Sequence, residues 1–145
     1  MAAIVTHFAD HNLPAPAMRG AASSSPTGVN AIMRLEGAAA FAAAIALYAH
    51  AGFSWSLFAL LILAPDLAML PYLLGPRAGA AAYNLAHTYA LALPLALAGY
   101  WLASPIASAL GLFWIAHIGM DRALGYGLKY ASGFRDTHLG RVGKN

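Results

Sequence analysis

The chain has 145 residues, enough for one domain, and 61% of them are hydrophobic whereas only 9% are charged. Soluble domains contain about 45–50% apolar and about 25% charged residues, so this composition indicates a protein whose solvent is lipid. The lack of cysteine excludes disulfides, iron–sulfur clusters, thiolate zinc sites and cysteine nucleophiles. A net charge of +3 is too small, and the basic residues too scattered, to indicate a nucleic-acid partner.

Residues 1–30 differ from the rest of the chain because they are rich in proline and serine and contain no sustained apolar run. They lack the apolar core of a signal peptide, so we expect a mobile cytoplasmic N-terminal tail. His7 and His11 have the i, i+4 spacing of a metal-binding pair on a helix. A solvated tail without a metal is the plainer interpretation of this segment.

Four apolar segments follow, at residues 31–50, 55–74, 78–102 and 105–128. Each approaches the roughly 20 residues needed to cross a bilayer. Glycine or proline separates them, for example at Gly52, Pro76 and Pro105, and such short connections favour antiparallel neighbours. The sequence therefore predicts an all-α polytopic membrane protein. Its antiparallel bundle of four transmembrane helices spans residues 31–130, and a cytoplasmic C-terminal segment occupies 131–145.

The basic residues orient this bundle. All eight lysines and arginines lie in or beside the tail, in the second turn, or at and beyond the end of the fourth segment: Arg19, Arg34, Arg77, Arg122, Lys129, Arg135, Arg141 and Lys144. The other two turns carry none. By the positive-inside rule, the sequence predicts a multi-pass protein of the inner (cytoplasmic) membrane with both termini in the cytoplasm.

Every predicted helix carries a polar residue in the cytoplasmic half of the membrane. These residues are Glu36, Asp66, Asn84, His87, His117 and Asp121. A carboxylate at such depth costs on the order of 3 kcal/mol, so these groups normally face the bundle interior and find partners. His117 and Asp121 share one helical face, and Thr88 extends the stripe of Asn84 and His87. With the adjacent Arg122, we expect them to form one polar cluster.

The second predicted helix has an interruption next to its carboxylate. Pro65 directly precedes Asp66, and its ring disrupts the helix and frees carbonyl groups one turn earlier. Within a membrane, such a break is tolerated where the backbone lines a protein cavity rather than lipid.

Four of the polar residues form a mixed nitrogen and oxygen ligand set, namely Asp66, His87, His117 and Asp121. Such a set suits Zn²⁺, Mn²⁺ or Fe²⁺, and the ion would offset the burial of the carboxylates. A water in an open position would then become a nucleophile near neutral pH. Glu36, nearer the surface, would serve as a base or orient a ligand.

The same residues also fit a structural polar network without a metal. Asp121 then pairs with Arg122 or with a neighbouring helix, and Glu36 pairs with Arg34 or Arg77. Each histidine is then a satisfied interior donor. Haem ligation by the two histidines is a further alternative, disfavoured because alanine-rich helices pack too closely to leave room for haem.

Several motifs carry a resemblance to a known family. They are PDL at 65–67, YLLGPR at 72–77, YNLAHTY at 83–89, HIGMDR at 117–122, GYGLKY at 125–130 and DTHLG at 136–140. Together they resemble a family of small bacterial integral membrane proteins catalogued as a domain of unknown function. The resemblance covers about residues 33–143 and implies a membrane location and the four-helix layout, but no activity.

A looser similarity concerns the order of the motifs. PD, a histidine-centred motif and HxxxD followed by glycine resemble the membrane-bound metal-dependent hydrolases, which are related to zinc-dependent phospholipases. That similarity implies that Asp66, His87, His117 and Asp121 are the metal ligands. The sequence departs from this pattern because it lacks the second histidine of the histidine-centred motif, and Asn84 stands three residues before His87.

The C-terminal segment intersperses Lys129, Arg135 and Arg141 with aromatic residues. Basic groups with aromatics at a cytoplasmic interface suit anionic lipid headgroups, and they equally suit interfacial anchoring with no ligand. Two hypotheses about function remain open. One is a metal-dependent membrane hydrolase acting on a phosphate-bearing lipid or a similar amphiphile. The other is a non-catalytic membrane protein, binding a partner or serving as a small transport element, whose buried charges fix helix register.

Overall fold

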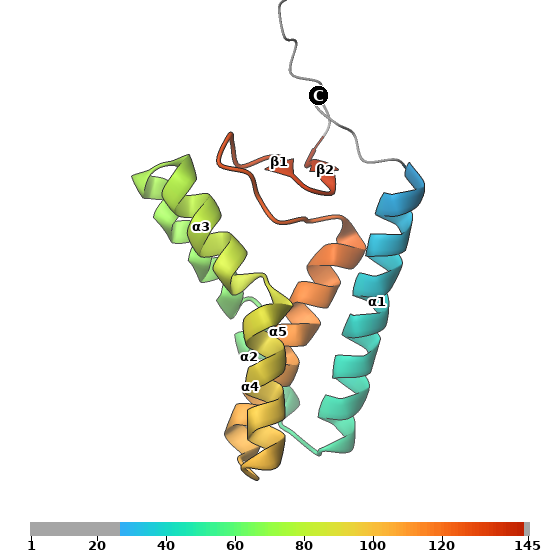
Figure 1. The fold of residues 1–145 in the computed structure, drawn as a ribbon. Coiled ribbons are helices and arrows are strands. Elements are labelled where there is room, and N and C mark those ends of the chain that lie inside the picture. Colours follow the sequence, from blue (N-terminus) through green and yellow to red (C-terminus); the bar gives the residue numbers. More distant parts are fainter. Residues whose placement is uncertain (1–26, 144–145) are drawn as a thin grey trace, which may run out of the picture.

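The computed structural model describes residues 27–143, so the histidine pair of the N-terminal tail lies outside the described residues. Figure 1 shows a predominantly helical chain that ends in a short antiparallel β-hairpin. The elements are α1 (Thr27–His50), α2 (Trp55–Leu61), the 3₁₀ helix η1 (Ala64–Leu74), α3 (Pro76–Ala86), α4 (Tyr89–Trp101), α5 (Pro105–Leu124), β1 (Asp136–Thr137) and β2 (Gly140–Arg141).

The second predicted helix is interrupted, as expected from its proline. The α-helix α2 ends at Leu61, and the tighter helix η1 begins at Ala64 with Pro65 in its first turn. The proline ring would clash with a carbonyl group one turn earlier in a continuous α-helix. The predicted break beside Asp66 is therefore confirmed.

The third predicted helix, residues 78–102, is also two helices, which the sequence analysis did not predict. The helix α3 ends at Ala86, and α4 begins at Tyr89 after the side chain of Thr88 accepts a hydrogen bond from the Ala90 N–H at 3.3 Å. This is an N-cap, which satisfies one of the free N–H groups at a helix start. The chain changes direction at this cap (Figure 1).

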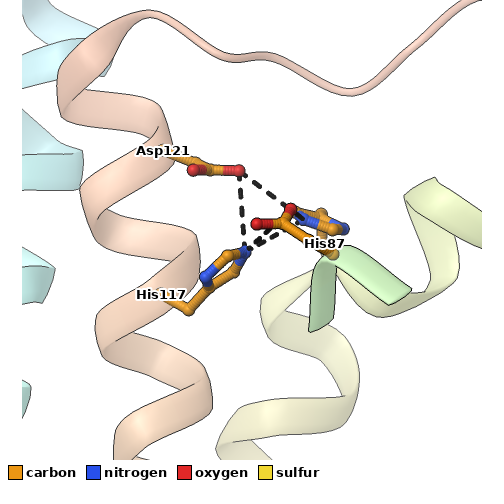
Figure 2. A group of neighbouring side chains, drawn as sticks. His87, His117 and Asp121 are labelled. Atoms are coloured by element: carbon orange, nitrogen blue, oxygen red, sulfur yellow. Dashed lines mark hydrogen bonds and ion pairs between the residues drawn. The ribbon is translucent and has the colours of Figure 1, made fainter. Parts of the chain in front are cut away.

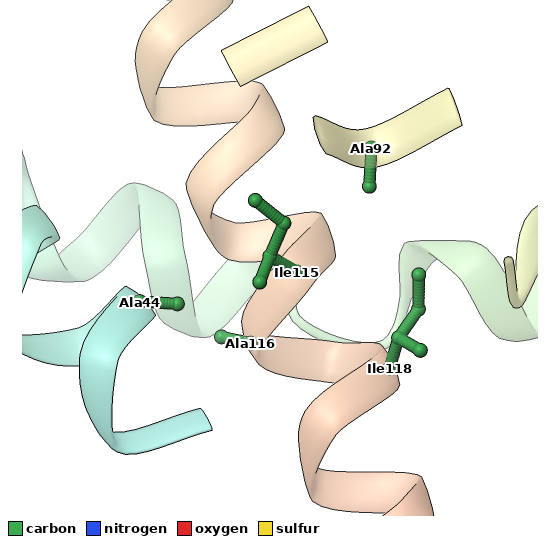
Figure 3. Packing of buried hydrophobic residues seen from close by; sticks show 5 residues of the cluster. All are labelled: Ala44, Ala92, Ile115, Ala116 and Ile118. Atoms are coloured by element: carbon green, nitrogen blue, oxygen red, sulfur yellow. The ribbon is translucent and has the colours of Figure 1, made fainter. Parts of the chain in front are cut away.

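The central helix is α5, which packs against α1 on one side and α4 on the other (Figure 1). Glycines let these backbones meet: a Cβ on Gly119 would lie 2.6 Å from Phe41 N, and one on Gly111 would lie 2.6 Å from the Ala96 Cβ. Small buried residues fill the interface, and Figure 3 shows Ala44, Ala92, Ile115, Ala116 and Ile118. Packing through small residues is typical of helices in lipid.

The helices η1 and α3 form a separate hairpin. They are joined at Gly75, whose φ of 120° favours glycine, and they pack mainly against each other. The ring of Tyr72 lies directly on Gly79, where a side chain would have no room. This hairpin leans away from α5 toward the end of the molecule where the β-strands lie (Figure 1).

Residues 125–143 close that end of the molecule and connect its parts. The side chain of Asn84 in α3 accepts a hydrogen bond from the Lys129 N–H at 2.7 Å and donates one to the Lys129 carbonyl at 2.9 Å. Asn30 in α1 donates to the Leu139 carbonyl at 3.0 Å. Residues 125–143 are therefore bonded to both α1 and α3.

Within residues 27–143, two stretches are long and apolar enough to cross a membrane: Gly28–His50, with mean hydropathy 1.4, and Trp55–Leu74, with mean hydropathy 2.1. Length and composition alone support this assignment. The helices α3 and α4 have 11 and 13 residues, and each is shorter than the roughly 20 needed for a span.

Candidate metal centre

The four predicted metal ligands come together. Asp66 lies in η1, His87 caps the end of α3, and His117 and Asp121 lie one turn apart on α5. Figure 2 shows the side chains of His117 and Asp121 leaving the same face of α5 toward His87. Each of the four residues offers one ligand atom, and these atoms all lie within 4.8 Å of one another.

The spacing of the ligand atoms fits a small ion. The Nε2 atoms of His87 and His117 are 3.1 Å apart. From these nitrogens to the oxygens of Asp66 and Asp121, the four distances are 3.3, 3.5, 3.6 and 3.8 Å. Around a tetrahedral ion with bonds of about 2.0–2.1 Å, ligand atoms lie about 3.3–3.4 Å apart. Five of the six distances between ligand atoms are therefore close to those of a four-coordinate site, and the sixth, between the two aspartate oxygens, is within 4.8 Å.

In its neutral form, His87 presents the ligand atom Nε2 without a proton; in its protonated form, Nε2 donates to Asp66 Oδ1 at 3.3 Å. Its Nδ1 lies 2.8 Å from the carbonyl oxygen of Tyr83, which can only accept, so Nδ1 carries the hydrogen. In the neutral ring, Nε2 then presents a lone pair toward Asp66 and Asp121, whose oxygens also carry lone pairs. These lone pairs repel one another, and a cation between them would replace the repulsion by attraction. The hydrogen bond to the Tyr83 carbonyl fixes the His87 ring in the orientation needed to bind such a cation.

His117 is fully buried, with 0% of its surface exposed. Its Nδ1 has no hydrogen-bond partner among the described residues, so its polar contacts are all made through Nε2. An unsatisfied buried polar atom costs about 1–3 kcal/mol. An ion bound at Nε2 would leave Nδ1 as an unpaired N–H donor, so this cost would remain.

Tyr83 supports the cluster and was not among the predicted site residues. Its hydroxyl group donates a hydrogen bond to Asp121 Oδ2 at 3.2 Å, and its ring stacks on the His87 ring with centroids 3.7 Å apart. It is 2% exposed. Its i, i+4 spacing from His87 on α3 was the available sequence signal.

Arg122 is buried, but it does not neutralise the neighbouring carboxylate. Its guanidinium donates to the His87 carbonyl at 3.3 Å and lies 2.7 Å from Nε2 of His138. The end of α3 leaves this carbonyl without a helical partner, so Arg122 holds the residue at the helix break. Within residues 27–143, neither carboxylate of the cluster forms an ion pair with lysine or arginine. The predicted Asp121–Arg122 pair is not formed.

The other residues of the predicted polar cluster have different places. Asn84 holds the C-terminal segment, and Thr88 caps α4. Glu36 is exposed on α1 and lies outside the four-residue cluster. It lines a pocket of about 320 Å³ together with Arg122 and His138. It makes no ion pair with an arginine in the described part of the chain.

Lys129, expected at a lipid-facing surface, is only 5% exposed. Its ammonium group donates to the Phe134 carbonyl at 3.0 Å and lies over the rings of Phe134 and Tyr83, 3.9 and 4.6 Å from their centroids. The pKa of Lys129 is lowered because burial disfavours the charged ammonium group, and the carboxylates of Asp121 and Asp66 oppose this shift only in part. The expected role of Lys129 as a headgroup ligand is therefore corrected to a buried cation beside the cluster. Arg135 and Arg141 are exposed.

Comparison with known proteins gives one match. No curated protein and no solved structure matches the chain. Residues 30–142 match the sequence model of a family described as "Domain of unknown function (DUF4260)". The match extends from α1 to the end of the C-terminal segment and includes all four candidate ligands. The resemblance to a family of unknown function is thereby confirmed, and the chain belongs to the DUF4260 family.

Proposed function

We propose that the protein is a metal-dependent hydrolase of the membrane, with a Zn²⁺, Mn²⁺ or Fe²⁺ ion held by Asp66, His87, His117 and Asp121. The observation that carries this proposal is the convergence of four ligand atoms from η1, α3 and α5 at the spacing of a tetrahedral site. Sequence-distant elements meet here in a geometry that suits an ion.

The distribution of buried charge supports a metal over a metal-free network. A network would be expected to pair the two carboxylates of the cluster with the two buried cations, Arg122 and Lys129. Both cations instead bind backbone carbonyl groups, of His87 and Phe134. The carboxylates face histidine nitrogens and the Tyr83 hydroxyl.

The surface of the protein supports a membrane location. Along Trp55–Leu74 none of the residues is buried, and large apolar side chains are exposed, among them Leu60, Leu67, Leu70, Leu73 and Leu74. Lipid would cover such a surface at no cost. We extend this to four crossings, made by α1, α2 with η1, α3 with α4, and α5. With this layout, the positive-inside rule supports a position of the cluster in the cytoplasmic half of the inner membrane.

The charge around the cluster favours an anionic substrate. A divalent ion would cancel the two carboxylates and would lower the pKa of a water at an open position. Arg122 and Lys129 then leave the surroundings positive. Asp66, with 33% of its side chain exposed against 13% for Asp121 and 0% for His117, marks the accessible side. Hydrolysis of a phosphate-ester lipid there forms one bond from water oxygen to phosphorus, breaks the bond to the leaving alcohol, and transfers the water proton to that alcohol.

A closed structural metal site is the second candidate, because four protein ligands would fill every position of a tetrahedral ion and leave none for water. The ion would then fix the η1–α3 hairpin to α5, and the protein would act through a partner or as a small transport element. The two candidates share the metal and differ in catalysis.

The first experiment is metal analysis of untagged protein purified in mild detergent without chelator. We expect about one ion per chain, lost in Asp66→Asn, His87→Gln, His117→Gln and Asp121→Asn. His50→Gln, an exposed histidine at the far end of α1, is the control and should keep the ion. If the wild-type protein binds no Zn²⁺, Mn²⁺ or Fe²⁺ and the ligand variants lose only thermal stability, the metal is rejected and the metal-free polar network is supported.

If the protein binds a metal but does not hydrolyse phosphate-ester lipids, the hydrolase is rejected and the structural metal site is supported.

A further inference from the structure

A second polar site lies where α1, the end of α5 and β2 meet. A pocket of about 360 Å³ is lined there by residues that include Asn30, Arg34, Gly125, Leu139 and Arg141. Among residues 27–143, no aspartate or glutamate lines this pocket. It therefore collects two positive charges, and the nearest carboxylate paired with either is that of Asp136, 3.9 Å from Arg141 Nε.

Arg34 enters this pocket with most of its donors unused. Its Nε donates to the Ala123 carbonyl at 2.9 Å, at the carbonyl end of α5. The guanidinium lies beside Gly125, where a Cβ would be 3.8 Å from its central carbon. The two terminal nitrogens make no hydrogen bond within residues 27–143. One side of the guanidinium is thus fixed and the other is available to a ligand.

Arg141 faces the same pocket from β2. It is exposed, and its one ion pair in the described chain is a long contact of 3.9 Å from Nε to the Asp136 carboxylate. Surface pairs of this kind contribute little energy. Its guanidinium is therefore free to turn toward an anion held by Arg34.

Asn30 supplies a third, independent observation. Its side-chain nitrogen donates to the Leu139 carbonyl at 3.0 Å, which leaves Oδ1 as an acceptor. That oxygen is buried and has no hydrogen-bond partner among the described residues. A ligand that carries a donor next to its anionic group would satisfy this oxygen.

We propose that this pocket binds the phosphate group of a phosphate ester whose alcohol carries a hydrogen-bond donor, such as a glycerol hydroxyl or an ammonium group. A guanidinium group binds phosphate through paired hydrogen bonds, and Arg34 and Arg141 each provide one such group. Asn30 Oδ1 accepts from the donor. The site is separate from the metal cluster and does not depend on it.

The test uses the full-length protein in detergent and native mass spectrometry. Phosphatidylglycerol is titrated into wild type, Arg141→Gln and Arg34→Lys, with glycerol phosphate and inorganic phosphate as competitors. We expect each variant to weaken retention of the lipid by about tenfold, as for the loss of a charge-assisted hydrogen bond. Arg77→Gln removes an exposed charge outside the pocket and should leave retention unchanged. Thermal unfolding of each variant identifies any loss of fold. Arg141→Gln should disturb the fold least, because the side chain of Arg141 makes a single weak contact.

The competitors distinguish the source of the phosphate. If glycerol phosphate displaces the lipid at equal concentration, the pocket recognises a soluble phosphate ester; if it does not, the acyl chains contribute and the ligand is a membrane lipid. Both results support a phosphate site. Equal retention in wild type and Arg141→Gln, or equal weakening by Arg77→Gln, would overturn it.

Discussion

Two regions of the molecule are held together by different forces. The α1–α4–α5 unit is a dry assembly in which glycines bring backbones into contact and small apolar residues fill the interface (Figure 3). The η1–α3 hairpin is joined to α5 by polar side chains, with Tyr83 bonded to Asp121 and the two histidines facing each other. Close packing therefore stabilises the α1–α4–α5 unit, whereas polar contacts hold the η1–α3 hairpin in position.

The largest expected effect is a loss of stability in the α1–α4–α5 unit. Gly111→Val places a branched side chain where even a Cβ would lie 2.5 Å from the Ala96 Cα, so α4 must move away from α5. Overpacking of this kind costs about 3 kcal/mol. We expect a correspondingly lower free energy of unfolding in detergent.

The matched control for this variant is Gly28→Ala. A Cβ on Gly28 meets nothing within 4 Å, and alanine is the better helix former. Its stability should stay level or rise slightly. A loss as large as that of Gly111→Val would mean that glycine matters for reasons other than close packing.

Removal of the metal tests the second region. With free ion at about 100 times its dissociation constant, binding adds about 2.7 kcal/mol to the stability of the bound form. Chelation should therefore raise the rate of proteolytic cleavage within η1 and α3 by about a hundredfold, and that within α1 much less. Mass analysis of the fragments measures both. Equal protection of the two regions with and without chelator would show that the hairpin does not depend on an ion.

Tyr83→Phe should produce the smallest of these effects. It keeps the ring stacked on His87 and removes the hydrogen bond to Asp121. Groups that orient a metal ligand typically contribute 10–100-fold in affinity, so we expect about tenfold weaker Zn²⁺ binding by competition with a chelating dye. Tyr126→Phe, at an exposed tyrosine, is the control. Unchanged affinity in Tyr83→Phe would remove this tyrosine from the site.

The four residues of the cluster could be predicted because charged and imidazole groups stand out in an apolar sequence. Charged and imidazole groups are rare in apolar segments, and the i, i+4 spacing of His117 and Asp121 fixed their common face. Pro65 likewise predicted the break beside Asp66, because its effect on a helix is local.

The break at Thr88 and the place of Lys129 could not be predicted in the same way. Thr88 lies within a long apolar segment, where its capping role depends on α3 turning toward η1. Lys129 has the sequence context of an interfacial lysine, and only the return of the C-terminal segment to Asn84 buries it. The cap at Thr88 and the burial of Lys129 both depend on contacts between distant parts of the chain, and such contacts cannot be predicted from the spacing of residues.

The return of the C-terminal segment has a consequence for biosynthesis. Asp66 and His87 enter the growing chain well before Asp121, and His138, which contacts the arginine behind His87, is made later still. If the chain crosses the membrane as proposed, Asp66 and His87 enter the bilayer during translation before His117 and Asp121 are made. The proposed ion would then be bound only by a nearly finished chain, and a chain stalled before α5 would leave the side chains of Asp66 and His87 without their partners.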